Sequence, residues 1–459
     1  MTPSSTDPDE VRELQNAFGT IRARESQLRE DRRLAELSLE VVRSLGNTSE
    51  HQSVLRTVAE SWTTDPNITL AVATLLVEQS ARRGMDEPII RDETPAAWAA
   101  RALEASLSSL DAESANDASV AGNLQATLAN ALRLCGPGHD AEARQASERA
   151  LELDDSQASW WSDAGLLHKW RGRFREGMRA IEAARERGAP SKPSLWNLAI
   201  CATGCGEGEV ATRAWRELSL PATSDPSTEM PIVEGLPPLM VRVLSRPSPT
   251  DGTTEFREGV GFELVWVAPL SPCHGVVQSP TFRDAPIDYG DLVLWDGAPV
   301  AQHTLASGER VPVFPLLEIL HRGDERRWPF VGIERKAGAL ERLRTTLPEG
   351  ARLFVQEERT VQHCASCEAG VPHEHAEADE SRSDPNADAR RFLRGKVVLG
   401  ASVELPAFQQ IWEASLSGQA WVASLPALYE ALHETKRAGQ EHQTWRGIER
   451  KWLAERTSA

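Results

Sequence analysis

Apolar residues return every three or four positions from about residue 8 to residue 220, which is the spacing that places one face of an α-helix against a core. Turn-forming residues interrupt the pattern at Gly46-Asn47, Asp65-Pro66, Gly84, Gly136-Pro137-Gly138 and Gly188-Ala189-Pro190. The first half of the chain is therefore predicted to be a series of short helices.

A spacing of 34 residues recurs within this helical half. It relates Ala143, Gly177 and Ala211 in one series, and Ala150, Ala184 and Leu218 in a second. Trp161 and Trp196 lie 35 residues apart and extend the same register. A helix pair of this length cannot bury its apolar face alone, so neighbouring pairs are expected to stack.

Over about residues 120–220 the chain resembles the tetratricopeptide repeat family. The unit of that family is a helix pair with an early aromatic residue, small residues where the helices meet and a proline near its end. The matching residues are Trp161, Ala164, Gly165, Gly177, Ile181, Ala184 and Pro190, then Trp196, Ala199, Ala211 and Ala214. Residues 8–115 are helical without a clear register. The resemblance implies a helical solenoid that binds protein or peptide partners.

In the family, the first helix of each unit lines a groove that holds peptides. The resemblance therefore suggests Lys169 and Asn197 as polar contacts with a partner. Lys169 belongs to the most basic stretch of the chain, which runs from His168 to Arg175. The alternative is a solvated helix face in which Arg171, Arg173 and Arg175 surround a turn at Gly172.

The pattern changes near residue 225, where Pro221 to Thr228 is rich in turn residues and predicts a linker. Beyond it, runs of Val, Leu, Phe and Trp predict strands at 262–268, 292–295, 352–357 and 396–399. Asp296-Gly297 predicts a tight hairpin turn. Helical patterns return at 405–415 and 428–454. We expect a helical repeat domain at 1–225 and a mixed α/β domain at 226–459, an α + α/β chain overall.

Two thiols and two imidazoles stand within twelve residues at Cys364, Cys367, His373 and His375. Zinc prefers four such ligands in a tetrahedron, and a two-residue spacer lets both sulfur atoms reach one ion. We expect a structural Zn2+ in an insertion at about 363–390. His363, Cys273 or His274 remains an alternative ligand. Redox chemistry at the Cys-x-x-Cys pair is disfavoured because Gly370 and Pro372 argue against the helix that it requires.

A second group of reactive residues follows Cys273-His274, with carboxylates at Asp284, Asp288 and Asp291 and the phenol of Tyr289. Thiol, imidazole and carboxylate are the parts of a nucleophilic site. Prolines and glycines flank the group, however, and aspartates commonly cap turns. The phosphate loop, the nucleophile elbow and the His-Glu-x-x-His helix are absent from the sequence. We therefore name no catalytic residue.

The formal net charge of −18 argues against non-specific binding to nucleic acid or to anionic membranes. The most apolar run, 68–77, is too short to span a bilayer, and the polar start lacks a secretory pattern, so a cytoplasmic protein is expected. Only six of the 50 basic residues are lysine, a bias that a GC-rich bacterial genome would explain.

These patterns together predict a non-catalytic protein that binds a protein partner through its repeats and carries a structural zinc site. The alternative is a metal- or cysteine-dependent enzyme with its active site in residues 230–459 and the repeats as a recruiting arm. Nothing in the sequence predicts the oligomeric state.

Overall fold

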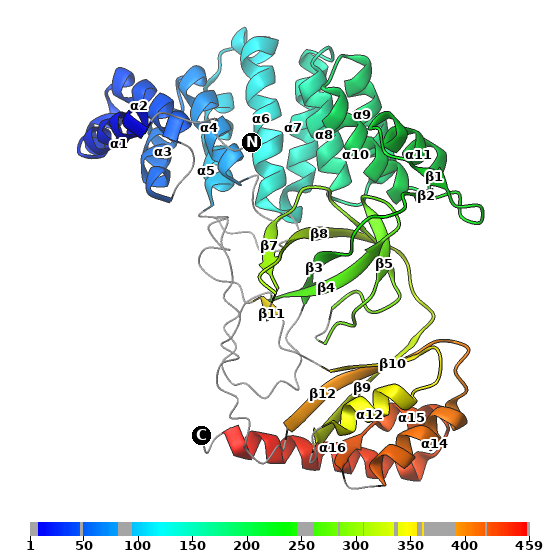
Figure 1. Ribbon diagram of the computed structural model, residues 1–459. Helices are drawn as coiled ribbons and strands as arrows, with labels where there is room; N and C mark the ends of the chain where they lie inside the picture. The colour runs from blue at the N-terminus through cyan, green and yellow to red at the C-terminus, as the bar shows by residue number, and fades with distance from the viewer. Residues whose placement is uncertain are drawn as a thin grey trace. The chain divides into compact units, whose positions relative to one another are not determined.

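The computed structural model describes residues 8–45, 49–80, 94–245, 261–282, 285–305, 307–334, 338–355, 360–361, 391–417 and 420–456. Internal contacts divide them into two units (Figure 1). The helical unit contains the chain up to Glu234 together with the segment Asp296–Val300. The sheet unit contains the other described residues. Helices and sheets are both present, so the chain is a mixture of α and β structure, as predicted.

The helical unit is a succession of antiparallel helices, beginning with α1 (Pro8–Arg22), α2 (Arg32–Leu45), α3 (Ser49–Ser61), α4 (Pro66–Ser80) and α5 (Pro95–Ser109). It continues with α6 (Asn123–Cys135), α7 (Asp140–Leu153), α8 (Ala158–Lys169), α9 (Phe174–Glu186), α10 (Ser191–Gly204) and α11 (Gly208–Glu217). The boundaries follow local chemistry. Thr94 Oγ1 accepts a hydrogen bond from the Ala97 N–H at 3.1 Å, and Pro95 starts α5.

Nine polar contacts between successive helix pairs of the described residues span 31–34 residues of sequence. The hydrogen bonds and ion pairs of this series join Glu25 to Thr57, Leu28 to Trp62, Arg32 to Asp65, Asn116 to Arg149, Asn130 to Asp163, Asp140 to Arg171, Asp155 to Arg187, Arg175 to Glu207 and Arg185 to Glu217. The series begins in residues 25–65, where the sequence showed no register. A repeated arrangement therefore underlies both parts of the helical unit.

Small residues allow the helices of one pair to approach closely. A Cβ on Gly165 would lie 2.6 Å from Ile181 Cγ1, and one on Gly177 would lie 3.0 Å from Cys201 Sγ. The predicted series Ala143, Gly177 and Ala211 is buried throughout. Three cysteines also pack within the helical unit, where Cys135 and Cys201 are buried and Cys205 is half-buried. The period in the sequence is thus a packing period.

The predicted linker is part of the helical unit. Thr223–Ser224 (β1) and Pro231–Ile232 (β2) pair antiparallel, and β1 and β2 contact α11. A Cβ on Gly208, at the start of α11, would collide with the carbonyl group of Glu229. The helical unit therefore extends to Glu234, beyond the boundary at 225 expected from the sequence.

The larger sheet has the strand order β11-β4-β3-β8-β6-β5, with β7 paired to β8. Its strands are β3 (Leu239–Ser245), β4 (Gly261–Pro269), β5 (His274–Val277), β6 (Leu292–Trp295), β7 (Ala301–Thr304), β8 (Arg310–His321) and β11 (Thr360–Val361). All pairs are antiparallel except β3 with β8. The alternating residues Val241, Val243, Val265, Val267 and Val293 are buried in its core.

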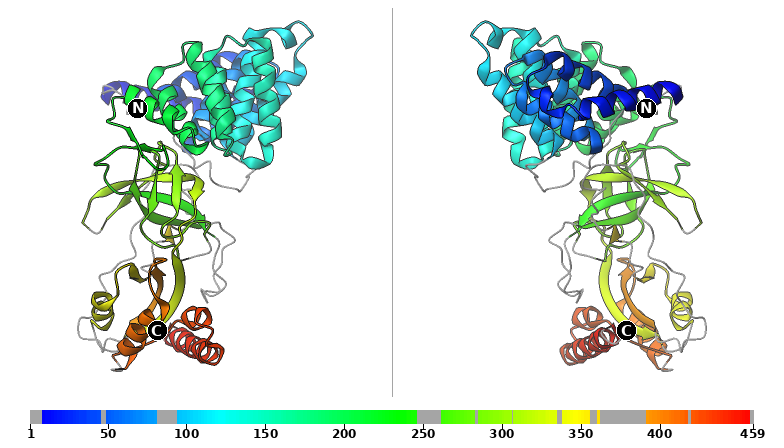
Figure 2. Two further views of the ribbon diagram at one scale, coloured as in Figure 1. Left: turned by 90° about the vertical axis from the view of Figure 1, so that its right-hand side faces the viewer. Right: turned by 90° about the vertical axis from the view of Figure 1, so that its left-hand side faces the viewer.

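The smaller sheet has the order β10-β12-β9-β13, formed by β9 (Arg326–Glu334), β10 (Ala351–Val355), β12 (Arg391–Leu399) and β13 (Trp421–Ser424). Its helices are α12 (Ala339–Thr346), α14 (Leu405–Leu416), α15 (Pro426–Ala431) and α16 (Thr435–Arg456). Helices α14 and α16 contact β13, and α15 and α16 contact β9. Figure 2 shows this C-terminal group of strands and helices, coloured yellow to red, from two sides. The Trp412 and Trp421 rings pack edge to face in the shared core, with their centroids 5.2 Å apart.

The predicted strands at 262–268 and 292–295 match β4 and β6, and those at 352–357 and 396–399 overlap β10 and β12. The predicted hairpin at Asp296-Gly297 is wrong. Strands β6 and β7 each pair with β8 and not with each other, so the segment between them is not a two-residue turn. This freedom from strand pairing allows Asp296–Val300 to pack with the helical unit.

Candidate functional site

The candidate site lies at the C-terminal end of α8, where Lys169 is only 2% exposed. Its ammonium donates a hydrogen bond to Asn197 Oδ1 of α10 at 2.7 Å and forms an ion pair with Asp296. Asp296 is 4% exposed. The two residues that the sequence suggested as partner contacts therefore lie together, and a carboxylate from a different part of the chain pairs with the lysine.

A second layer of charged groups surrounds Lys169. Asn130 donates to Asp163 Oδ2 at 2.7 Å and accepts from Arg133 Nη2 at 2.9 Å. Burial lowers the pKa of Arg133, while Asp163 and Asp296 oppose that shift. Burial raises the pKa of Asp163, opposed by Arg133 and by the hydrogen bond from Asn130. The site is thus an enclosed set of charges whose protonation depends on their neighbours.

Arg171 joins this layer rather than a solvated helix face. Its guanidinium donates from Nε to Asp140 Oδ1 at 2.7 Å and from Nη2 to the carbonyl oxygen of Arg133 at 2.9 Å. The solvated-face alternative is therefore wrong for Arg171. It holds for Arg175, whose side chain is 52% exposed in its ion pair with Glu207.

An aromatic wall borders the site on α10. The Trp196 indole packs edge to face on Trp215, with the ring centroids 4.9 Å apart. A Cβ on Gly297 would collide with Trp196. Trp196 Nε1 is enclosed, and among the described residues it has no hydrogen-bond partner. The position next to Asp296 therefore has room for glycine alone.

A separate groove of about 490 Å³ lies among α7, α8 and α9. Its floor is apolar and its rim carries both signs of charge, with lining residues that include Trp161, Ala164, Leu167, Ala180, Arg144, Glu148, Glu176 and Arg179. His168 borders it, and burial, followed by the nearby Arg173, lowers the pKa of this imidazole. The imidazole is therefore held mainly in its neutral form.

The reactive group at Cys273-His274 is enclosed. Both residues are at most 1% exposed, and Ser271 Oγ lies 2.6 Å from His274 Nδ1 and 3.6 Å from Cys273 Sγ. Burial lowers the pKa of His274 to about 4. The serine thus connects two side chains that strand geometry would otherwise direct apart. We interpret this trio as packing that orients the start of β5.

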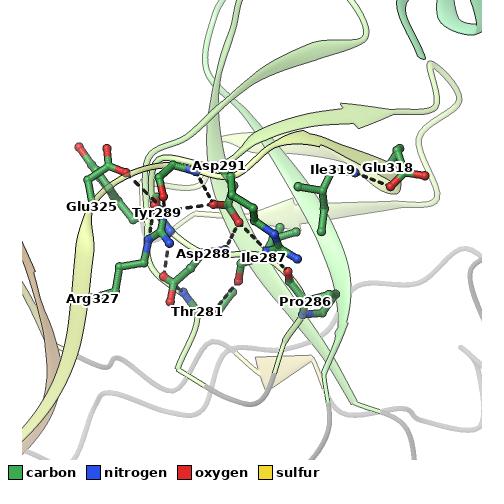
Figure 3. A network of polar contacts seen from close by, with 12 residues as sticks. Thr281, Pro286, Ile287, Asp288, Tyr289, Asp291, Glu318, Ile319, Glu325 and Arg327 are labelled. Carbon is green, nitrogen blue, oxygen red and sulfur yellow. Dashed lines mark hydrogen bonds and ion pairs between the residues drawn. The ribbon is translucent and has the colours of Figure 1, made fainter. Parts of the chain in front are cut away.

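The aspartates of that same stretch form a different network, centred on Asp291 (Figure 3). Asp291 is fully buried and accepts hydrogen bonds from the Asp288 N–H, the Gly323 N–H, Arg322 Nη1 and Arg327 Nη2 at 2.9–3.0 Å. Asp288 also pairs with Lys396 of β12. These contacts connect the start of β6 with β9 and β12, so Asp288 and Asp291 join the two sheets of the sheet unit. Asp284 lies outside the described residues.

The predicted zinc ligands Cys364, Cys367, His373 and His375, and the alternative ligand His363, all lie outside the described residues. Within the described part of the chain, no three His, Cys, Asp or Glu side chains are grouped to hold a metal ion. Cys273 and His274 are therefore not part of a described metal cluster. The zinc site stays a prediction from the sequence.

Fold and site together define a helical-repeat protein joined to an α/β unit. No protein-family model matches the chain, and no curated protein matches it in sequence. A solved structure titled "Crystal structure of MamA protein" aligns with 42% of this chain and 90% of that chain, at 13% identity and a TM-score of 0.30. A likeness of this size carries no argument, so the assignment rests on the contacts described above. None of the described helices is long and apolar enough to cross a membrane.

Sequence reasoning missed Asp296 and Gly297 as parts of the site. The Asp-Gly pair was interpreted as a hairpin turn, and it lies 127 residues from Lys169 along the chain. The available signal was the chemistry of Lys169 itself, because a lysine that faces a groove beside an asparagine needs an anion when it is buried.

Proposed function

We propose that the protein is a non-catalytic interaction protein of the tetratricopeptide-repeat type, whose helical unit binds a protein partner in the cytoplasm. The observation that carries the proposal is the enclosed Lys169–Asn197 pair, which holds a carboxylate presented by a non-helical segment. A repeat surface with a buried cation has the chemistry to recognise an extended or looped acidic segment.

The stacking of the helices supports this function. Contacts separated by 31–34 residues join successive helix pairs within residues 25–65 and again within residues 116–217, so the pairs stack in a repeated arrangement in both stretches. Charged and polar side chains of α6, α8 and α10 converge near Lys169. A binding site assembled from several repeats gains specificity because each repeat contributes a separate contact.

The proposal also includes a structural Zn2+ held by Cys364, Cys367, His373 and His375. Four protein ligands leave no coordination position for a reacting water, which favours a stabilising role over catalysis. The spacing of the ligands supports this part of the proposal, and metal analysis tests it.

Partner binding is tested by affinity capture with the full-length chain and two matched variants. Lys169→Glu reverses the charge inside the site, whereas Lys192→Glu makes the same change at an exposed position on α10. We expect the wild type and Lys192→Glu to capture a protein that Lys169→Glu does not capture. Circular dichroism establishes that the variants keep their helices. Identical capture by all three folded chains would contradict the proposal.

A further inference from the structure

The occupant of the Lys169 site is a short piece of this chain, the segment Asp296–Val300. Its first two residues make the contacts with the site, since Asp296 pairs with Lys169 and Gly297 lies against Trp196. Asp296 is buried, Gly297 and Val300 are half-buried, and Ala298 and Pro299 are exposed. The Ala298 N–H donates to Asp296 Oδ1 at 2.9 Å, which turns the chain away immediately after the glycine. The recognised unit is therefore a two-residue Asp-Gly pair.

Two independent features select this pair. Charge selects the aspartate, because the ion pair with Lys169 is almost completely enclosed, with side chains 3% and 6% exposed. Space selects the glycine, because any Cβ at position 297 would collide with the Trp196 indole. Gly297 does not have a positive φ, so the requirement comes from the wall of the site and not from the backbone conformation.

The charges balance only when the aspartate is present. The cations at this position are the buried Lys169 and Arg133 together with Arg171, and the carboxylates are the buried Asp296 and the half-buried Asp163 and Asp140. Without Asp296 the enclosed Lys169 ammonium would keep Asn197 Oδ1 as a neutral acceptor and would lack a counter-charge. Burying an uncompensated charge is strongly unfavourable, so the emptied site would bind another carboxylate of the same shape.

We propose that Asp296-Gly297 is an internal competitor at a site that recognises an exposed Asp-Gly pair on a protein partner. This inference rests on the function proposed above and adds to it the class of ligand and a mechanism of regulation. In the structure the Lys169 site holds Asp296-Gly297 of the same chain, and a partner binds by displacing this segment. Effective affinity is reduced by the fraction of time for which the internal segment occupies the site.

The test uses a fluorescently labelled, end-blocked peptide with the sequence of residues 294–301, and two matched peptides. One carries asparagine in place of the aspartate, and the other carries valine in place of the glycine. Binding is measured by fluorescence polarisation to the full-length wild type and to the double variant Asp296→Asn/Gly297→Val. Pro299→Ala serves as the control, because Pro299 belongs to the same segment but is exposed.

We expect the unmodified peptide to bind the double variant at least tenfold more tightly than the wild type or Pro299→Ala. Both matched peptides should bind the double variant at least tenfold more weakly than the unmodified peptide. A folded double variant that fails to bind the peptide, or that binds all three equally, would overturn the inference.

A second measurement does not depend on the folding of the double variant. Excess peptide added to the wild type should speed hydrogen exchange in residues 296–300, and the asparagine peptide should leave it unchanged. Unchanged exchange with a saturating peptide would overturn the inference. The proposed function and the internal competition can be distinguished. If a partner is captured through Lys169 but binds the wild type and the double variant with equal affinity, the proposed function stands and the internal competition is refuted.

Discussion

Arg327 Nη2 donates to Asp291 Oδ1 at 3.0 Å, and the carboxylate that accepts this bond is fully buried. The same guanidinium donates from Nε to the Tyr289 carbonyl oxygen at 2.7 Å. One arginine of β9 is thereby fixed to the chain just before β6. This carboxylate and the Asp288–Lys396 ion pair both connect the two sheets of the sheet unit.

Asp291→Asn should destabilise the sheet unit by about 2–3 kcal/mol, because hydrogen bonds to charged groups contribute roughly 1.5–3 kcal/mol. Glu325→Gln is the matched control, since Glu325 pairs with the same arginine at 3.3 Å but its side chain is 26% exposed. Exposed pairs contribute about 0–1 kcal/mol. Urea unfolding followed by near-ultraviolet circular dichroism measures both. Equal losses in the two variants would contradict the role assigned to Asp291.

Lys169→Met should cost about 3–5 kcal/mol, because it leaves Asp296 buried without a counter-charge. Adding Asp296→Asn should restore part of that stability, and the double-mutant cycle gives the coupling between the two residues. Lys192→Met, at an exposed position, should change stability by less than about 0.5 kcal/mol. Chemical denaturation of the wild type, the two single variants, the double variant and Lys192→Met measures these values. Strict additivity of the two buried substitutions would refute the ion pair.

Gly165→Ala and Gly19→Ala should have opposite effects on the helical unit. The new methyl at 165 would meet Ile181 Cγ1 at 2.6 Å, and overpacking of this kind costs about 1–3 kcal/mol. Nothing lies within 4 Å of the position that a methyl would take at Gly19, so the higher helix propensity of alanine should add about 0.5–1 kcal/mol. Thermal unfolding distinguishes the two, and a shared sign would contradict the close crossing.

Acid should weaken the sheet unit partly through His274. Burial lowers its pKa to about 4, whereas the unfolded chain has an ordinary value of about 6.5. The unfolded state therefore binds the proton first, so stability is fully present above pH 6.5 and falls as the pH drops toward 4. The loss from this group approaches about 3 kcal/mol.

His274→Asn removes that titration and keeps a polar group near Ser271. Its unfolding free energy should fall less than that of the wild type between pH 7.5 and pH 4.5. Identical pH profiles for His274→Asn and the wild type would show that the imidazole does not titrate as described.

Removal of two zinc ligands should release the metal. The double variant Cys364→Ser/Cys367→Ser should lose one equivalent of zinc and melt at a lower temperature, since structural zinc in small domains contributes on the order of 10–16 kcal/mol. Cys205→Ser, at a half-buried cysteine of the helical unit, should keep the metal. Elemental analysis beside thermal unfolding measures both properties. Zinc retained by the double variant would exclude these two ligands.

The sequence predicted the parts of the fold that a local period encodes. Small residues at Ala143, Gly177 and Ala211 revealed the repeat because the helix crossing requires small volume at one position per unit. The earlier helices repeat through contacts such as Trp62 Nε1 with the Leu28 carbonyl oxygen. The other early contacts join Glu25 to Thr57 and Arg32 to Asp65, so the residue types differ from one contact to the next and no recurring residue revealed this register.

Only the helical side of the Lys169 site could be predicted from the sequence. Lys169 and Asn197 lie on the first helices of neighbouring units, α8 and α10, which the period predicted to stack, although the two residues are 28 positions apart and are not equivalent in the repeat. Asp296 reaches them because β6 and β7 both pair with β8 and leave the intervening segment unpaired. Strand order of this kind depends on long-range pairing, which a short Asp-Gly pattern does not report.

The fixed 31–34-residue reach of the contacts between helix pairs also has a mechanical consequence. Tension applied to the two ends of residues 116–217 would act on a series of similar polar contacts, each of which closes a loop of one unit. Stretching in an optical trap should therefore proceed in uniform steps of roughly 11 nm, the extended length of some 33 residues. The helix pairs would then unfold one after another under load and not all at once.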